Sequence, residues 1–267
     1  MKANAVIVYL CGPSAQDRLD LEESLRRLYI HFNRQFQYDV IVFHENLSGD
    51  YIKWLFERPY CKMPIRDVVI RFHIPPGTPD NVINSTPGYR AMCRWFSGPF
   101  FHCEELKNYR WCWHFDTDSF LMGPVEYDPF LYLQEHNKIY GYQVIYNEPP
   151  HARVGFWEVT KKFIEQKGIQ SDFLKLHSDA QGNWNYDYYY SDFAIFDLDF
   201  FRANNYMEYF KYIDASGGFW LHRYGDTLMC SLGLFMFAKE KDTHQFRDIA
   251  WMHQTYYNDG KSIIRKE

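Results

Sequence analysis

Two carboxylates stand one residue apart in the segment WHFDTDSF, which covers residues 113–120. In WCWHF (111–115), just upstream of Asp116 and Asp118, aromatic residues occupy alternate positions, which is typical of a half-buried strand. On an extended chain, side chains one residue apart point to opposite faces, so these carboxylates converge only if the strand ends and the chain turns. Carboxylate oxygens suit Mn²⁺ and Mg²⁺, ions that also bind diphosphates. The spacing predicts either a metal–nucleotide site or a turn in which Asp serves local hydrogen bonds.

The elements before these carboxylates are typical of a nucleotide-binding half of an α/β domain. Residues 5–10 (AVIVYL) form a continuous apolar run, as a buried parallel strand does. Ser14 is placed to cap a following helix whose leucines recur at helical spacing. Further strands are predicted at 38–44 and 65–72, and a helix at 89–106, before the strand that ends at Asp116. Ligands bind at the carboxyl ends of such strands, which places the two carboxylates where chemistry is expected.

The second half of the sequence predicts a mixture of strands and helices. A strand is expected at 138–146, a helix at 154–167, and a strand that continues into a helix across 191–214. Asp226 precedes an apolar helix, and by itself it is explained as the N-cap of that helix. The predicted fold class is therefore α/β, in one domain that covers residues 1–267.

Composition excludes several functional classes. The net charge of −5 opposes a nucleic-acid surface, which needs a basic patch. No apolar run approaches ~20 residues, so no membrane span is predicted in this chain. The sequence as it stands therefore predicts a cytoplasmic protein, or a protein of the Golgi lumen if an N-terminal anchor has been removed. The six cysteines show no zinc spacing and are predicted to be buried free thiols rather than a disulfide framework. Aromatic residues make up 20% of the chain, which indicates a ring-rich core, with some rings available to a sugar.

From about residue 20 to 257, the chain resembles the fungal α-1,2-mannosyltransferases of the Kre2/Mnt1 type, glycosyltransferase family 15. The resemblance is carried by FNRQFQYDVIVF (32–43), GYRAMCRWFSGPFF (88–101), YRWCWHFDTDSF with EYDPF (109–130), NKIYGY (137–142), YYSDFAIFDLDFFR (189–202), YFKYIDASGGFW with RYGD (209–226) and HQFRDIAWMH (244–253). It implies a GT-A fold with a Rossmann-like nucleotide-binding half (1–120), an acceptor-binding half (121–267) and a mixed central sheet. It also implies Mn²⁺ (or Mg²⁺) as cofactor, and transfer of α-mannose from GDP-mannose to a glycan hydroxyl with retention.

The resemblance also implies roles for individual residues. The metal carboxylate of the family falls on Asp116, and a second metal ligand falls on His253, which alone is explained as a core histidine. We include Asp118 as a third ligand that instead contacts the donor if it does not reach the metal. Tyr89, otherwise one of 22 tyrosines, matches a donor-site residue. Asp226 matches the family's Arg-x-Gly-Asp segment and is a predicted catalytic residue.

Two departures from the family pattern change these expectations. Family members carry Asn-Phe-Glu where this chain has Asp192, Phe193 and Ala194, and that Glu is their proposed nucleophile. We therefore predict that Asp192 or Asp226 orients the acceptor without forming a covalent intermediate; the alternative is an inactive carbohydrate-binding relative. Cys11 and Gly12 stand where the family tends to have Arg, which leaves a UDP-sugar as the alternative donor.

Overall fold

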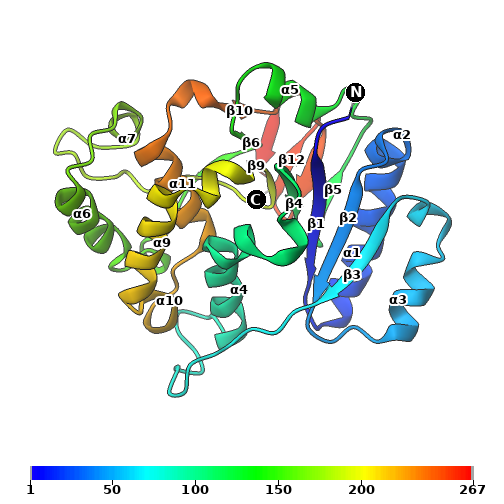
Figure 1. Cartoon of the computed structure of the whole chain (residues 1–267), viewed down its shortest axis with the longest axis horizontal. Coiled ribbons are helices and arrows are strands. Elements are labelled where there is room, and N and C mark those ends of the chain that lie inside the picture. The colour runs from blue at the N-terminus through cyan, green and yellow to red at the C-terminus, as the bar shows by residue number, and fades with distance from the viewer. Residues whose placement is uncertain (1, 266–267) are drawn as a thin grey trace.

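Seven strands form a mixed sheet at the centre of the protein in a computed structural model that describes residues 2–265 (Figure 1). Their spatial order is β10–β6–β9–β4–β1–β2–β3. The strands are β1 (Ala5–Cys11), β2 (Asp39–His44), β3 (Ile65–Val69), β4 (Trp111–Phe115), β6 (Tyr140–Tyr142), β9 (Phe193–Asp197) and β10 (Thr243–Gln245). The first four are parallel, whereas β9 is antiparallel to both of its neighbours. The predicted mixed α/β sheet is confirmed.

The order of the strands places a crevice beside β1. From β1 the chain moves outward through β2 to β3, and then crosses back to β4 on the other side of β1. At such a reversal the connections leave in opposite directions, which opens a ligand site at the carboxyl ends of the strands. Asp116 follows β4 directly and therefore lies at this edge.

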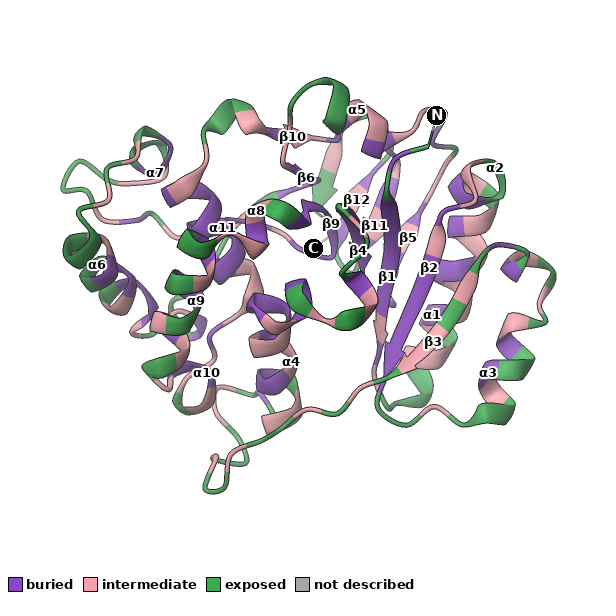
Figure 2. Cartoon of the chain, viewed as in Figure 1, coloured by how far each residue is buried: buried purple, intermediate pink, exposed green. Residues whose placement is uncertain are grey.

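Helices cover both faces of the sheet. One core packs α1 (Ala15–Leu28), α3 (Gly49–Phe56) and α5 (Pro129–Glu135) against the sheet, and the other packs α4 (Pro87–Ser97), α8 (Leu198–Arg202), α9 (Asn204–Ala215) and α11 (Asp226–Phe237). As a result all five residues of β4 are buried, so the prediction of a half-buried strand is wrong (Figure 2). The alternation in WCWHF separates the two cores, with Trp111 and Trp113 in one and Cys112 in the other.

A second, antiparallel sheet brings the C-terminal segment to the predicted site. Its order is β13 (Ile263–Arg265), β12 (Tyr256–Asn258), β11 (Trp251–His253) and β5 (Ser119–Leu121). In this register His253 pairs with Ser119, the residue after Asp118. The pairing joins two segments that are more than a hundred residues apart in the sequence.

Several predicted elements differ from the observed ones in their bounds. The predicted helix at 89–106 ends as α4 at Ser97, because Gly98 and Pro99 interrupt it and two short 3₁₀ turns follow. The predicted strand at 138–146 divides into β6 and β7 (Ile145–Asn147), and β7 pairs with β8 (Asp187–Tyr189) in a separate ribbon. The helix predicted to run on to 214 is broken at Ala203.

Other local predictions are confirmed. Ser14 caps α1, since its hydroxyl accepts a hydrogen bond from the Asp17 amide at 3.0 Å. The remaining helices are α2 (Arg34–Phe36), α6 (Phe156–Lys167), α7 (Asp172–Leu176) and α10 (Gly218–Leu221). All six cysteines are free thiols, and five of them are buried. Between residues 2 and 265, no helix combines the length and the apolar character needed to cross a membrane.

Candidate active site

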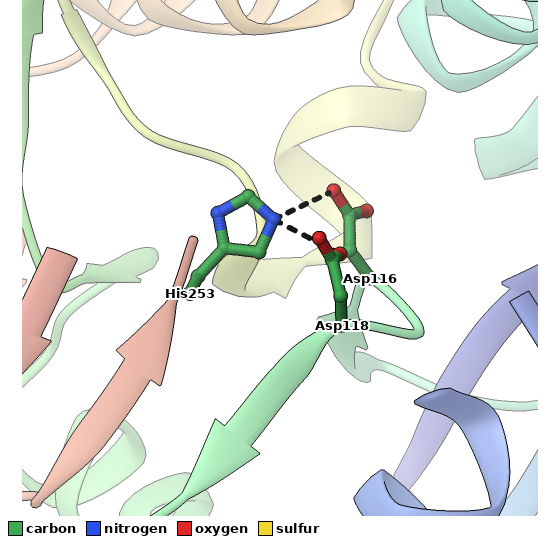
Figure 3. Close-up of side chains that lie close together, drawn as sticks. All are labelled: Asp116, Asp118 and His253. Carbon is green, nitrogen blue, oxygen red and sulfur yellow. Dashed lines mark hydrogen bonds and ion pairs between the residues drawn. The ribbon is translucent and has the colours of Figure 1, made fainter. Parts of the chain in front are cut away.

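Asp116, Asp118 and His253 converge at the carboxyl end of β4 (Figure 3). The chain turns after β4, and the carbonyl of Asp116 accepts a hydrogen bond from the Ser119 amide at 3.1 Å. This turn brings both carboxylates to one side, so the turn and the metal site predicted from the sequence are compatible. Nε2 of His253 lies 3.0 Å from Asp118 Oδ1 and 3.8 Å from Asp116 Oδ2. One ligand atom from each residue falls within a cluster no wider than 4.8 Å.

The donor set and its charge suit a divalent cation. Two carboxylate oxygens and one imidazole nitrogen are ligands that Mn²⁺ accepts, and the half-exposed Asp116 leaves space for water and phosphate oxygens. The side chain of Asp116 is 46% exposed, but it lines both cavities and lies near other acidic side chains. Loss of hydration and the nearby Asp192, Asp118 and Asp226 raise its pKa to about 7, against an opposing effect of His253. A bound cation would relieve this concentration of negative charge.

His253 is the positive centre of the cluster when no metal is present. Burial lowers its pKa, but Asp192, Asp118 and Asp116 outweigh that effect and raise the pKa to about 11. An imidazole ligates a metal only through an unprotonated nitrogen, so a divalent ion would replace the proton on Nε2. This exchange of one proton for a divalent ion adds one positive charge to the acidic cluster.

A cavity of about 610 Å³ lies on the β1 side of the cluster. Cys11 and Gly12 line it at the end of β1, as the sequence analysis placed them, together with Thr117 and Asp118. A Cβ on Gly12 would lie 2.5 Å from a carboxylate oxygen of Asp17, so the helix-capping Asp17 fills the space that a side chain would need. This cavity has five acidic lining residues, Asp17, Asp20, Glu45, Asp116 and Asp118, and no Lys or Arg from the described part of the chain.

A second cavity, of about 510 Å³, lies on the other side of the cluster. Asp192, Asp226 and His253 line it together with four tyrosines, namely Tyr89, Tyr146, Tyr188 and Tyr190. The two cavities share Asp116, Tyr89, Met92, Phe96 and Gln254. The acid–histidine cluster therefore stands at the junction of an acidic cavity and an aromatic one.

The structure brings the other predicted residues to this junction in different ways. Tyr89 is 38% exposed, and its hydroxyl accepts a hydrogen bond from Nη2 of Arg223 at 3.0 Å. Asp226 is the first residue of α11 rather than its N-cap, which is Gly225, and it accepts a hydrogen bond from the Ser191 hydroxyl at 3.1 Å. Asp192 is buried, and its Oδ2 lies 2.8 Å from Nδ1 of His253.

No carboxylate occupies the place of the family's proposed nucleophile. Ala194 is wholly buried in β9 and pairs with His114 in β4. His114 lines the aromatic cavity, and its Nδ1 lies 3.0 Å from the Ser191 carbonyl, so Nδ1 carries the proton. Burial lowers the pKa of His114 to about 4, which keeps the ring neutral.

Sequence reasoning missed three polar residues of the aromatic cavity: His114, Glu148 and Arg223. Glu148 is 7% exposed, and its Oε1 lies 3.7 Å from Nη1 of Arg223. Arg223 belongs to the RYGD segment, which could have indicated it, whereas Glu148 follows a short edge strand and carries no local signal. Only the fold brings the two together.

Glu148→Gln should stabilise the protein more at about pH 8 than at about pH 5. Burial raises the pKa of Glu148 to about 7, against the opposing charge of Arg223. A Glu in the unfolded chain titrates near ~4.3, so the folded protein holds this proton more tightly, and wild-type stability falls as the pH rises from ~4 through ~7. Glutamine does not titrate and escapes this loss.

Thermal melts at both pH values check this expectation, with Glu165→Gln on the exposed face of α6 as the control. The advantage of Glu148→Gln over wild type should grow with pH. An advantage that is the same at both pH values would show that the buried glutamate is not held protonated.

Known proteins share both the sequence and the fold of this chain. The family model for glycolipid 2-α-mannosyltransferases matches residues 80–267, well over half of the chain. A probable mannosyltransferase of Saccharomyces cerevisiae, KTR3, is 29% identical over 96% of this chain and 68% of its own length. Glycolipid 2-α-mannosyltransferase 2 of Candida albicans is also 29% identical, over 96% of this chain and 59% of its own length. The chain thus spans only part of these longer relatives.

Solved structures agree with the sequence relatives. Core-mannan synthase A of Aspergillus fumigatus, crystallised in a Mn/GDP form, superposes with a TM-score of 0.87 and 26% identity, over 100% of this chain and 79% of that one. The mannosyltransferase Ktr4p of S. cerevisiae shares the fold, with a TM-score of 0.85 and 24% identity over 97% of this chain and 73% of that one. These neighbours confirm the predicted GT-A fold. The chain belongs to the glycolipid 2-α-mannosyltransferase family, glycosyltransferase family 15.

Proposed function

We propose that this chain is a metal-dependent retaining mannosyltransferase, which moves α-mannose from GDP-mannose to a hydroxyl of a glycan. The observation that carries the proposal is the cluster of Asp116, Asp118 and His253 at the junction of two cavities. A transferase needs its donor and its acceptor on the two sides of one reacting centre, and this arrangement provides both.

Asp116, Asp118 and His253 would hold Mn²⁺ or Mg²⁺. When bound, such an ion supplies Lewis-acid stabilisation of the negative charge on the leaving diphosphate. The acidic cavity is assigned to the nucleotide, since it lies at the carboxyl ends of β1 and β4. Tyr89 borders both cavities and is held by Arg223, so we assign it to the passage between nucleotide and sugar.

The aromatic cavity is assigned to the acceptor glycan. Tyrosine rings suit the apolar faces of sugars. We assign Asp226, a carboxylate that lines this cavity, to orienting the acceptor hydroxyl. Because Ala194 presents only a methyl group, retention here would not pass through a glycosylated side chain; the leaving diphosphate would serve as base on the same face. An inactive carbohydrate-binding relative is the second candidate, favoured by the same Ala194, and release of GDP from GDP-mannose in Mn²⁺ would exclude it.

Guanine suits the acidic cavity better than uracil. Guanine presents adjacent N1–H and N2–H donors, which one carboxylate can accept together, whereas the single N3–H of uracil is flanked by two carbonyls that a carboxylate repels. Asp20 and Glu45 line the cavity as acceptors of this kind. The Mn/GDP form of core-mannan synthase A supports the same choice.

Calorimetry with GDP and UDP in the presence of Mn²⁺ tests the choice of base. We expect GDP to bind at least tenfold more tightly, a difference of about 1.4 kcal/mol. A tenfold preference for UDP would overturn the mannose assignment while leaving a metal-dependent glycosyltransferase. Equal affinities for GDP and UDP would show that the acidic residues of the cavity do not discriminate between guanine and uracil.

A further inference from the structure

Asp192 is a buried carboxylate whose role the residues around it define. It is 3% exposed and lies in the turn that enters β9. Neither of its oxygens makes an aligned hydrogen bond within the described part of the chain. Among residues 2–265, its one charged neighbour at ion-pair distance is His253, with 2.8 Å between Asp192 Oδ2 and Nδ1 of the ring. A buried carboxylate with so few partners is costly, which points to a function rather than to packing.

The imidazole of His253 stands between Asp192 and the other two acids. Its Nδ1 faces Asp192, while its Nε2 faces Asp116 and Asp118 (Figure 3 shows the Nε2 side). The ring is 2% exposed and packs near Trp251 at 6.3 Å and Tyr190 at 5.4 Å between centroids. These contacts hold the ring in one plane, so a group on Nδ1 acts directly on what Nε2 can bind.

We propose that Asp192 is a positioning residue of the metal centre, which acts through His253 and does not touch the acceptor. The inference rests on the metal site of the proposed function. A metal-binding nitrogen needs its lone pair free, so the ring proton must sit on the opposite nitrogen. Asp192 Oδ2 lies 2.8 Å from Nδ1, close enough to accept that proton in a hydrogen bond after a small rotation of the ring. This hydrogen bond would fix the tautomer and the ring orientation and make Nε2 a stronger ligand.

This role gives a physical reading of the sequence Asp192-Phe193-Ala194. β9 begins at Phe193, so Asp192 precedes the strand and turns toward His253, while Ala194 lies inside the strand beside His114. The carboxylate at 192 is therefore not a displaced substitute for a nucleophile at 194. It contacts the nitrogen of His253 that faces away from the proposed metal.

The test compares Mn²⁺ affinity in Asp192→Asn and wild type, by electron paramagnetic resonance titration without nucleotide. Asparagine keeps the shape and an acceptor oxygen but loses the charge. We expect Mn²⁺ to bind ~10–100-fold more weakly, as for other residues behind metal-bound histidines. The histidine-nitrogen coupling to Mn²⁺ should change in the same samples. Asp192→Ala, which also removes the acceptor oxygen, should bind more weakly still.

Asp226→Asn is the matched control, since it removes one charge from the same cavity without contacting His253. Its Mn²⁺ affinity should stay within about threefold of wild type. Unchanged Mn²⁺ affinity and nitrogen coupling in Asp192→Asn would overturn the proposal, and a loss of turnover alongside would assign Asp192 to the acceptor instead. An equal loss in both Asn variants would overturn it too, as a general charge effect. His253→Ala distinguishes failure of the proposal for Asp192 from failure of the proposed metal site. If His253→Ala binds Mn²⁺ like wild type, the assignment of the metal site is wrong.

Discussion

Asp116→Ala is expected to abolish Mn²⁺-dependent GDP binding and to lower mannosyl transfer by at least about a hundredfold. Asp116 lies at the junction of both cavities, 3.8 Å from Nε2 of His253, so alanine removes one of the three proposed metal ligands. Loss of Lewis-acid stabilisation at a leaving group costs several kcal/mol of barrier, and each ~1.4 kcal/mol is a factor of ten in rate. Calorimetry and a GDP-release assay measure the two effects separately.

The fold should survive this substitution, which makes the loss interpretable. Burial raises the pKa of Asp116, and the nearby acids Asp192, Asp118 and Asp226 raise it further. Alanine removes a carboxylate whose charged form is disfavoured at this position, so the melting temperature should not fall. Asp172→Ala, which removes an exposed carboxylate on α7, is the control and should retain GDP binding. Undiminished Mn²⁺-dependent binding by Asp116→Ala would show that the metal lies elsewhere.

Chelation of divalent ions is expected to weaken GDP binding by at least about a hundredfold in the wild-type protein. Five carboxylates and no described Lys or Arg line the acidic cavity, which we assign to the nucleotide. A diphosphate entering it without a cation meets like charge at close range, in surroundings where charges interact more strongly than in water. With Mn²⁺ bound, Asp116 and Asp118 would act as its ligands, and the charge of the ion would offset the repulsion between the cavity and the diphosphate.

The check is GDP titration in EDTA and again after Mn²⁺ is restored. Guanosine, which has no phosphate, is the control ligand, and its weaker binding should change little between the two conditions. Full GDP affinity in EDTA would mean that side chains alone hold the diphosphate. Restoration by Mg²⁺ as well as Mn²⁺ would agree with the hard oxygen ligands of the site.

Regular patterns in the sequence predicted the first strands and the first helix of the chain, because apolar runs and a capping serine act over neighbouring residues, whereas α3 was not predicted. The parallel strands at 5–10 and 38–44 and the helix after Ser14 are all observed. Longer elements were predicted where two short ones exist, as at Gly98 and Pro99. There Gly98 and Pro99 end the helix although the apolar pattern continues beyond them, because proline cannot extend an α-helix.

The candidate site was predicted more completely by the family resemblance than by local pattern. Asp116 and Asp118 stand out locally, but His253 reaches them only because β11 pairs with β5. Glu148 and Arg223 are joined across β7 and the loop before α11, which no spacing rule detects. The contact between Asp192 and His253 likewise depends on how the turn before β9 is folded. These are properties of three-dimensional proximity, and sequence periodicity does not encode them.

Proton NMR of a reaction with GDP-mannose, Mn²⁺ and an α-mannoside acceptor measures retaining mannosyl transfer most directly. We expect a new anomeric signal of α-linked mannose that appears together with GDP and is absent with EDTA or with Asp116→Ala. A β-linked product would contradict retention. If neither transfer nor GDP release occurs with Mn²⁺ present, the proposed enzymatic activity is wrong, and the chain would be a sugar-binding member of the family.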